Sequence, residues 1–82
     1  MNEASETNIS IIIATNLRIA RQVKGLTLQD VGKLLGITYQ QCQKYETGKH
    51  TIPICKLLII ANHMDIPISF FFEKFELVKK AS

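Results

Sequence analysis

Residues 27–49, TLQDVGKLLGITYQQCQKYETGK, constrain the fold of this chain more than any other stretch. Two threonines, Thr27 and Thr38, are each followed three positions later by a side chain that can return a hydrogen bond, Asp30 or Gln41. This arrangement is typical of a reciprocal cap at a helix start. Gly36 lies between the two starts, and glycine tolerates the left-handed conformation of a C-terminal cap. The stretch therefore predicts two short helices joined by a tight turn.

The two predicted helices offer different faces. The first has one apolar stripe, formed by Val31, Leu34 and Leu35. The inward side of the second is formed by Ile37, Cys42 and Tyr45. Its opposite face carries hydrogen-bonding groups and no carboxylate, on Tyr39, Gln40, Gln43 and Lys44. Two capped helices around a glycine turn, the second polar and tolerant of anions, indicate a helix-turn-helix over residues 27–46.

Several segments of the chain, in order and spacing, resemble the phage Cro and C1 repressor family, also called the Xre family. Within the motif the matching residues are Gly32, Gly36, Val31, Leu35 and Ile37. The flanking matches are residues 21–27, 45–49, 60–67 and 70–72. The resemblance covers residues 13–72. It implies a lambda-repressor-like DNA-binding domain that acts as a homodimer on a two-fold symmetric operator.

One position departs from the family pattern. The first residue of the second helix is usually a glutamine in this family, where it holds a phosphate, but this chain has Leu28. We therefore expect one phosphate contact fewer and a modest affinity for DNA.

The length of 82 residues allows one domain. We expect residues 1–8 to be a flexible N-terminus, residues 9–78 to form the domain and residues 79–82 to be a C-terminal tail. The expected fold class is all-α, a compact bundle of five short helices. No signal peptide precedes the two cysteines, which favours a reduced, cytoplasmic protein. The longest apolar run is far too short to cross a membrane.

The helices outside the motif are predicted from apolar periodicity. The first is expected to be capped at Asn8 or Ser10 and to run to about Lys24. Its inward stripe would comprise Ile9, Ile13, Leu17 and Ala20. A fourth helix is expected after Pro53, with its inward side formed by Ile54, Leu57, Ile60, Ala61 and Met64.

A short fifth helix is expected over residues 69–73. The apolar residues that follow, Phe75, Leu77 and Val78, either continue this helix or pack back on the domain. Leu58 and Ile59 extend the apolar surface of the fourth helix beyond what one inward face needs. Exposed apolar surface of this kind marks interfaces, so we expect a homodimer contact. The residues expected to form it are Leu58, Ile59, Phe70, Phe71 and Leu77.

Positive charge is concentrated on the motif and its flanks. The whole chain carries +3, whereas residues 16–56 contain seven Lys or Arg against two acidic residues, which leaves +5 there. A polyanion would be held at that place. The resemblance and the chemistry of bases assign base reading to Tyr39, Gln40, Gln43 and Lys44. Phosphate contacts are expected from Thr27, Thr38, Lys49 and His50.

Arg21 lies four residues after Leu17, on the expected inward side of the first helix. Two interpretations are open for it, a phosphate contact and an ion pair with Glu46. The ion pair is the favoured interpretation, and the family resemblance supports it as well. Such a pair would join the first helix to the end of the third helix.

Enzymatic or metal chemistry finds little support. The serines lack the sequence context of a nucleophile, and no glycine-rich phosphate loop or His-Glu metal motif is present. The spacing of Cys42, His50, Cys55 and His63 matches none of the common zinc modules. We expect no enzymatic activity, no metal and no cofactor.

The function predicted from the sequence is sequence-specific binding of double-stranded DNA by a transcription regulator, most simply a repressor. The alternative is a protein-interaction module of the same fold, similar to an antitoxin that binds a partner without reading DNA. The apolar surplus at residues 58–59 and 70–72 supports the alternative. The polar, acid-free face of the third helix argues against it.

Overall fold

The computed structural model describes residues 6–74, which form four α-helices and a terminal 3-10 helix. Their bounds are α1 Glu6–Val23, α2 Leu28–Leu35, α3 Tyr39–Thr47, α4 Ile54–Met64 and η1 Ile68–Phe72. The all-α class predicted from the sequence is confirmed, and these residues contain no strand. Two details of the prediction are corrected: α1 is 18 residues long rather than short, and the fifth helix is a 3-10 turn.

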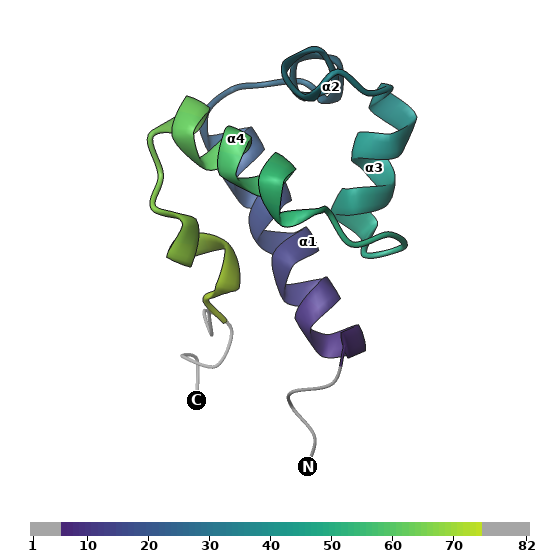
Figure 1. Cartoon of the computed structure of the whole chain (residues 1–82), viewed down its shortest axis with the longest axis vertical. Coiled ribbons are helices and arrows are strands. Elements are labelled where there is room, and N and C mark those ends of the chain that lie inside the picture. The colour runs from purple at the N-terminus through teal and green to yellow at the C-terminus, as the bar shows by residue number, and fades with distance from the viewer. Residues whose placement is uncertain (1–5, 75–82) are drawn as a thin grey trace.

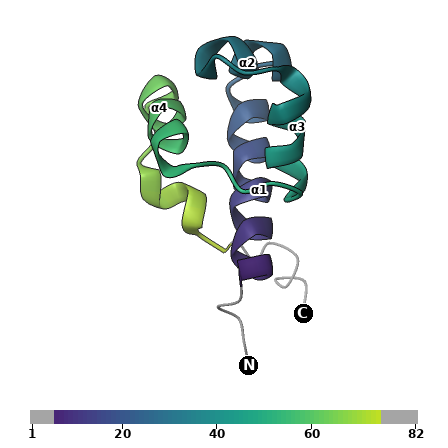
Figure 2. The same cartoon turned by 45° about the vertical axis from the view of Figure 1, so that its right-hand side comes forward.

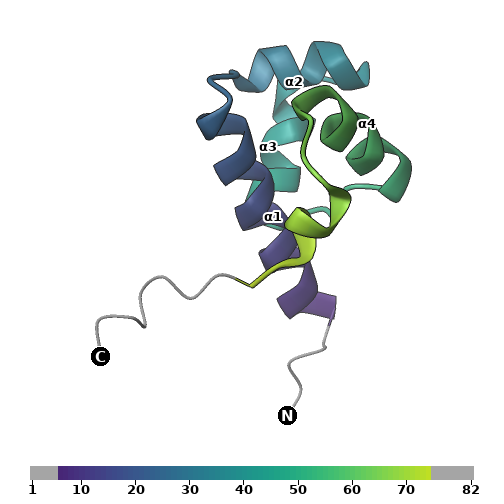
Figure 3. The same ribbon diagram turned by 90° about the vertical axis from the view of Figure 1, so that its left-hand side faces the viewer.

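The helices are arranged around α1. Figure 1 shows α2 across one end of α1, while η1 and the first turn of α1 lie towards the other end. In Figure 2, α3 and α4 lie on different sides of α1. Contacts between α1 and α3 and between α2 and α3 hold the motif together, whereas η1 packs on α1. Figure 3 shows η1 returning beside α1 after α4. None of the described helices has the length and apolar character needed to span a membrane.

The start of α1 differs from the prediction. The helix begins at Glu6, so neither Asn8 nor Ser10 is its cap, and its first residues fall within the stretch expected to be a flexible N-terminus. The first turn is polar and carries no apolar period, which is why the pattern of apolar residues placed the start too late. The predicted tail at residues 79–82 lies outside the described residues.

The helix-turn-helix forms through the local signals that the sequence contains. The hydroxyl of Thr27 accepts from the backbone N–H of Asp30, and the carboxylate of Asp30 accepts from the backbone N–H of Thr27. Gly36 ends α2 with φ of 71°, in the left-handed region. Gly32 allows α2 to approach the turn, because a Cβ there would lie 2.8 Å from the carbonyl oxygen of Ile37. These contacts set the angle at which α3 leaves the turn.

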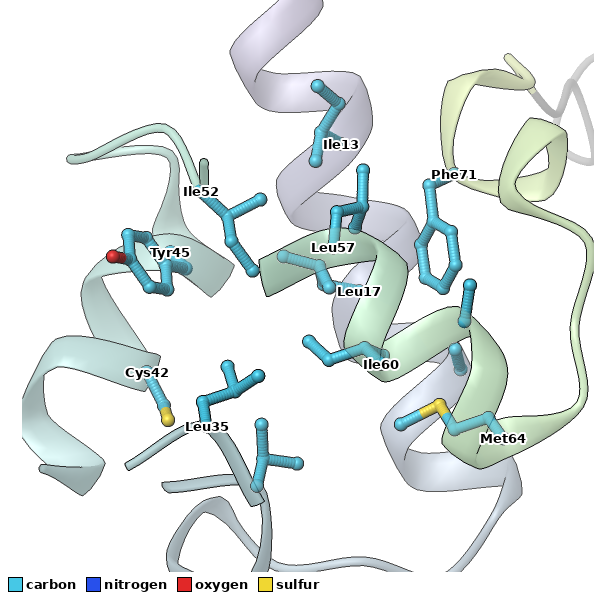
Figure 4. Packing of buried hydrophobic residues seen from close by; sticks show 13 residues of the cluster. Ile13, Leu17, Leu35, Cys42, Tyr45, Ile52, Leu57, Ile60, Met64 and Phe71 are labelled. Carbon is cyan, nitrogen blue, oxygen red and sulfur yellow. The ribbon is translucent and has the colours of Figure 1, made fainter. Parts of the chain in front are cut away.

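Side chains from every helix meet in one apolar core (Figure 4). Its buried members are Ile13, Leu17, Ala20, Val31, Leu35, Cys42, Tyr45, Ile52, Leu57, Ile60, Ala61, Met64 and Phe71. Most of the predicted inward residues are therefore buried. Ile9 and Ile54 are exposed instead. Both lie near the start of a helix. The neighbouring elements cover the middle of the helix but not its start, so these two side chains stay exposed.

Phe71 was predicted in the dimer contact, and this prediction is wrong. Its side chain is 0% exposed and its ring points from η1 towards α4 (Figure 4). Phe70 is partly buried and meets Phe71 edge to face at a centroid distance of 5.3 Å, whereas Phe72 is 47% exposed. Successive residues of a 3-10 helix point about 120° apart, so one ring of the three turns inward. Leu77 lies outside the described residues.

Asn16 holds η1 in this orientation, a role that the apolar pattern of the sequence does not predict. The side chain is 2% exposed. Its Nδ2 donates to the carbonyl oxygens of Phe70, Phe71 and Glu73 at 3.2, 3.0 and 2.7 Å. Asn16 lies one residue before Leu17 and four before Ala20, so helical spacing places it on the inward side of α1. This position is the signal in the sequence that Asn16 is buried. A buried amide needs partners, and here these partners are the carbonyls at the end of η1.

Candidate nucleic-acid interface

The outward side of α3 is a polar surface. Tyr39, Gln40 and Gln43 are exposed and Lys44 is partly exposed, while Cys42 and Tyr45 point into the core. In Figure 2, α1 lies beside α3 and α2 lies across its upper end. The four predicted base-contacting residues therefore belong to one helix and one accessible surface, with a single positive charge and no acidic residue among them.

The two helix starts differ in how well they suit an anion. At α2, the Asp30 carboxylate accepts a hydrogen bond from the backbone N–H of Thr27. This hydrogen bond is the main reason why the pKa of Asp30 is lowered, so the carboxylate stays ionised at neutral pH. At α3, the hydroxyl of Thr38 accepts from the N–H of Gln41, and the first turn has no acidic residue. The start of α3 is therefore the better place for a phosphate.

Position 28 also bears on phosphate binding. Leu28 is partly buried and packs against the apolar core. The residue that replaces the usual glutamine therefore adds packing and offers no hydrogen bond to a phosphate.

The loop after α3 brings the remaining predicted phosphate contacts next to the same surface. Gly48 ends α3 with φ of 82°, and Lys49 and His50 follow it with exposed side chains. The sequence predicted that Gln41 would complete a reciprocal cap with Thr38. Instead, Nε2 of Gln41 lies 3.0 Å from Nδ1 of His50. The amide is long enough to reach the loop after α3, which the pattern around Thr38 does not indicate.

Arg21 and Glu46 form an ion pair, as the sequence predicted. Nε of Arg21 lies 2.6 Å from Oε2 of Glu46, and Nη2 donates to Oε1 at 3.0 Å. Nη1 donates to the carbonyl oxygen of Leu26 at 2.9 Å. The hydrogen bond with Glu46 is the largest cause of a raised pKa of Arg21, which therefore stays charged. The pair joins α1, the loop before α2 and the last turn of α3.

The two cysteines lie in different environments. Cys42 lies on the inward side of α3 and is buried, and this burial is the main cause of the raised pKa of its thiol. Cys55 is exposed on α4. Within residues 6–74, no three His, Cys, Asp or Glu side chains come together as a metal site would require.

The profile of the family described as helix-turn-helix matches residues 17–71. The chain belongs to the Cro/C1-type helix-turn-helix family. The resemblance read from residues 13–72 is thereby confirmed, and the matched residues include the turn at Gly36 and all of α3.

Two relatives and one solved structure show how the helix-turn-helix chain compares. An uncharacterised HTH-type transcriptional regulator of Sinorhizobium medicae is 36% identical over 72 residues, which are 88% of this chain and 52% of that protein. An uncharacterised HTH-type transcriptional regulator of Rickettsia conorii is 35% identical over 72 residues, 88% of this chain and 58% of that protein. The chain thus spans only about half the length of these curated relatives.

A solved structure with a similar fold is the crystal structure of an HTH_3 family transcriptional regulator from Vibrio cholerae. The TM-score is 0.73 at 26% sequence identity, over 83% of this chain and 38% of that chain. The likeness covers most of the described helix-turn-helix domain.

Proposed function

We propose that this chain is a transcription regulator that binds double-stranded DNA in a sequence-specific manner. The observation that carries the proposal is the outward surface of α3, where four polar side chains without a carboxylate follow a capped helix start. A helix of this kind fits the major groove of B-DNA. The relatives named above are called transcriptional regulators, which supports the same function.

The outward surface of α3 would read the bases. Gln40 and Lys44 are four residues apart and so lie on one face of α3. A glutamine pairs with adenine through two hydrogen bonds, and a lysine pairs with O6 and N7 of guanine. Tyr39 and Gln43 border these two residues and would support them.

Phosphate contacts come from both ends of α3. Thr38 and the backbone N–H groups of the first turn would bind one phosphate. Lys49 and His50 would bind another beyond the last turn. Thr27 would contribute less, since the Asp30 carboxylate is bonded to its backbone. These contacts hold the protein in register but carry no sequence information.

Repression is the simplest form of regulation for such a domain, because a protein that occupies a promoter blocks access to it. The test of the function is a selection of bound sequences from random duplex DNA. Recovery of one two-fold symmetric motif is the expected result, and recovery of no motif would favour the protein-interaction module.

A homodimer is proposed through the outward face of α4. Leu58 and Ile59 are each 44% exposed, Ile54 and Cys55 are exposed beside them, and this face carries no charge. A second copy fits such a neutral apolar face, and a dimer would present two α3 helices to successive major grooves. Phe71 has no place in it, because its ring is in the core.

Replacing Leu58 with lysine is expected to convert the dimer to a monomer. A buried charge on each side of a two-fold contact has no partner, which is strongly unfavourable. Sedimentation at micromolar concentration measures the effect. Val23 is exposed on α1, outside the proposed contact, so Val23→Lys serves as the control and should leave the mass unchanged. A wild-type chain that sediments as a monomer both free and on DNA would contradict the dimer.

Replacing Gln40 with alanine is expected to cost about 1–3 kcal/mol on the selected site and to relax the choice of one base pair. Replacing Lys49 with alanine should weaken selected and random DNA alike and reduce the salt slope by about one unit. Titrations on both DNAs at several salt concentrations measure these effects. Equal weakening of the two DNAs by Gln40→Ala would show that this face does not read bases.

A further inference from the structure

The loop that follows α3 is fastened to two helices. The backbone N–H of His50 donates to the carbonyl oxygen of Lys44 at 3.2 Å, and the ring of His50 is bonded to Gln41 at 3.0 Å. The next residue, Thr51, shares a hydrogen bond of 2.7 Å with the hydroxyl of Ser10 on α1. The imidazole of His50 is thus held against α3 at an exposed position beside Lys49.

The contact between Gln41 and His50 favours one tautomer of the ring. Nε2 of Gln41 lies next to Nδ1 of His50, and this amide group has two N–H donors and no acceptor. In this arrangement Nδ1 accepts, and in a neutral imidazole the proton then resides on Nε2. Nε2 is the ring nitrogen that points away from Gln41. The ring consequently offers an N–H donor to whatever approaches the loop from outside.

We propose that Gln41 is a positioning residue, which holds His50 in the Nε2–H tautomer so that this N–H is ready to donate to a DNA phosphate. The role of the phosphate rests on the proposed function, whereas the tautomer belongs to the free protein. A neutral imidazole donates to a phosphate oxygen without first taking up a proton. A donor that is already oriented loses less conformational freedom on binding. Gln41 would thereby act on DNA without touching it.

The tautomer can be measured in the free protein. Long-range nitrogen-15 spectra at pH 8, where a histidine is neutral, distinguish Nε2–H from Nδ1–H. The expected result for the wild type is Nε2–H for His50. Gln41→Met keeps the length of the side chain and removes the donor, so it should shift the signals towards a mixture. The matched control is Gln22→Met on α1, at an exposed position, which should leave the signals unchanged. An Nδ1–H tautomer, or identical spectra for Gln41→Met, would overturn the proposal.

Binding measurements test the consequence for DNA. Gln41→Met is expected to weaken selected and random DNA by the same factor, about three- to tenfold. In a His50→Ala background the same substitution should have no further effect, because residues that act through one another are not additive. An undiminished loss in that background would overturn the positioning role. If no variant binds DNA at all, the proposed function fails, while the spectra still decide the tautomer.

Discussion

Replacing Phe71 with alanine is expected to lower the free energy of unfolding by about 3–5 kcal/mol, as for other buried aromatic residues. Its ring is fully buried, belongs to the core cluster and meets Phe70 edge to face. The alanine leaves a cavity between η1 and α4, which lose the contacts that the ring made with the core. Urea denaturation followed by circular dichroism measures the change.

The neighbouring ring provides a matched control. Phe72 is 47% exposed, so Phe72→Ala should change the unfolding free energy by less than about 1 kcal/mol. Because the full truncation of Phe71 approaches the total stability of a small domain, Phe71→Leu is the milder companion, with an expected loss of about 1 kcal/mol. Similar losses for Phe71→Ala and Phe72→Ala would show that Phe71 is not the ring on which the core depends.

Replacing Glu46 with glutamine is expected to cost about 2–3 kcal/mol and to lower the melting temperature by about 10–20 °C. The Arg21 and Glu46 side chains are 15% and 11% exposed, so the cost lies below that of a fully buried pair. The guanidinium keeps its charge in this variant, because arginine stays protonated in proteins whether or not a carboxylate is present. The glutamine carbonyl can accept a hydrogen bond but cannot balance this charge. Thermal unfolding measures the change.

Two further variants distinguish the effect of breaking the ion pair from the effect of removing any carboxylate. Glu73 is exposed, and Glu73→Gln should leave the melting temperature within about 2 °C of the wild type. The double variant Arg21→Met with Glu46→Leu removes both charges and should be more stable than Glu46→Gln alone. A melting temperature only about one degree lower for Glu46→Gln would mean that water, rather than Glu46, neutralises the guanidinium.

The candidate site was largely predictable because its signals are local. The hydroxyl of Thr38 caps α3 within one turn of itself, and Gly36 takes the left-handed conformation that its place in the sequence required. The face that carries Gln40 and Lys44 follows from helical spacing once the start of α3 is known. The partners of Gln41 were not predictable in this way, since His50 reaches it only through the path of the loop.

The sequence alone thus determined the helix-turn-helix, the polar surface of α3 and most of the core. The tertiary structure decided which ring of residues 70–72 is buried, that Ile9 and Ile54 remain exposed, and that Asn16 binds the end of η1. The physical reason is that caps, turns and helical periods depend on atoms a few residues apart. Periodicity shows which side of a helix is apolar, but what covers that side depends on elements far along the chain. Asn16 and Phe71 are separated by 55 positions, and only the packing of η1 on α1 brings them together.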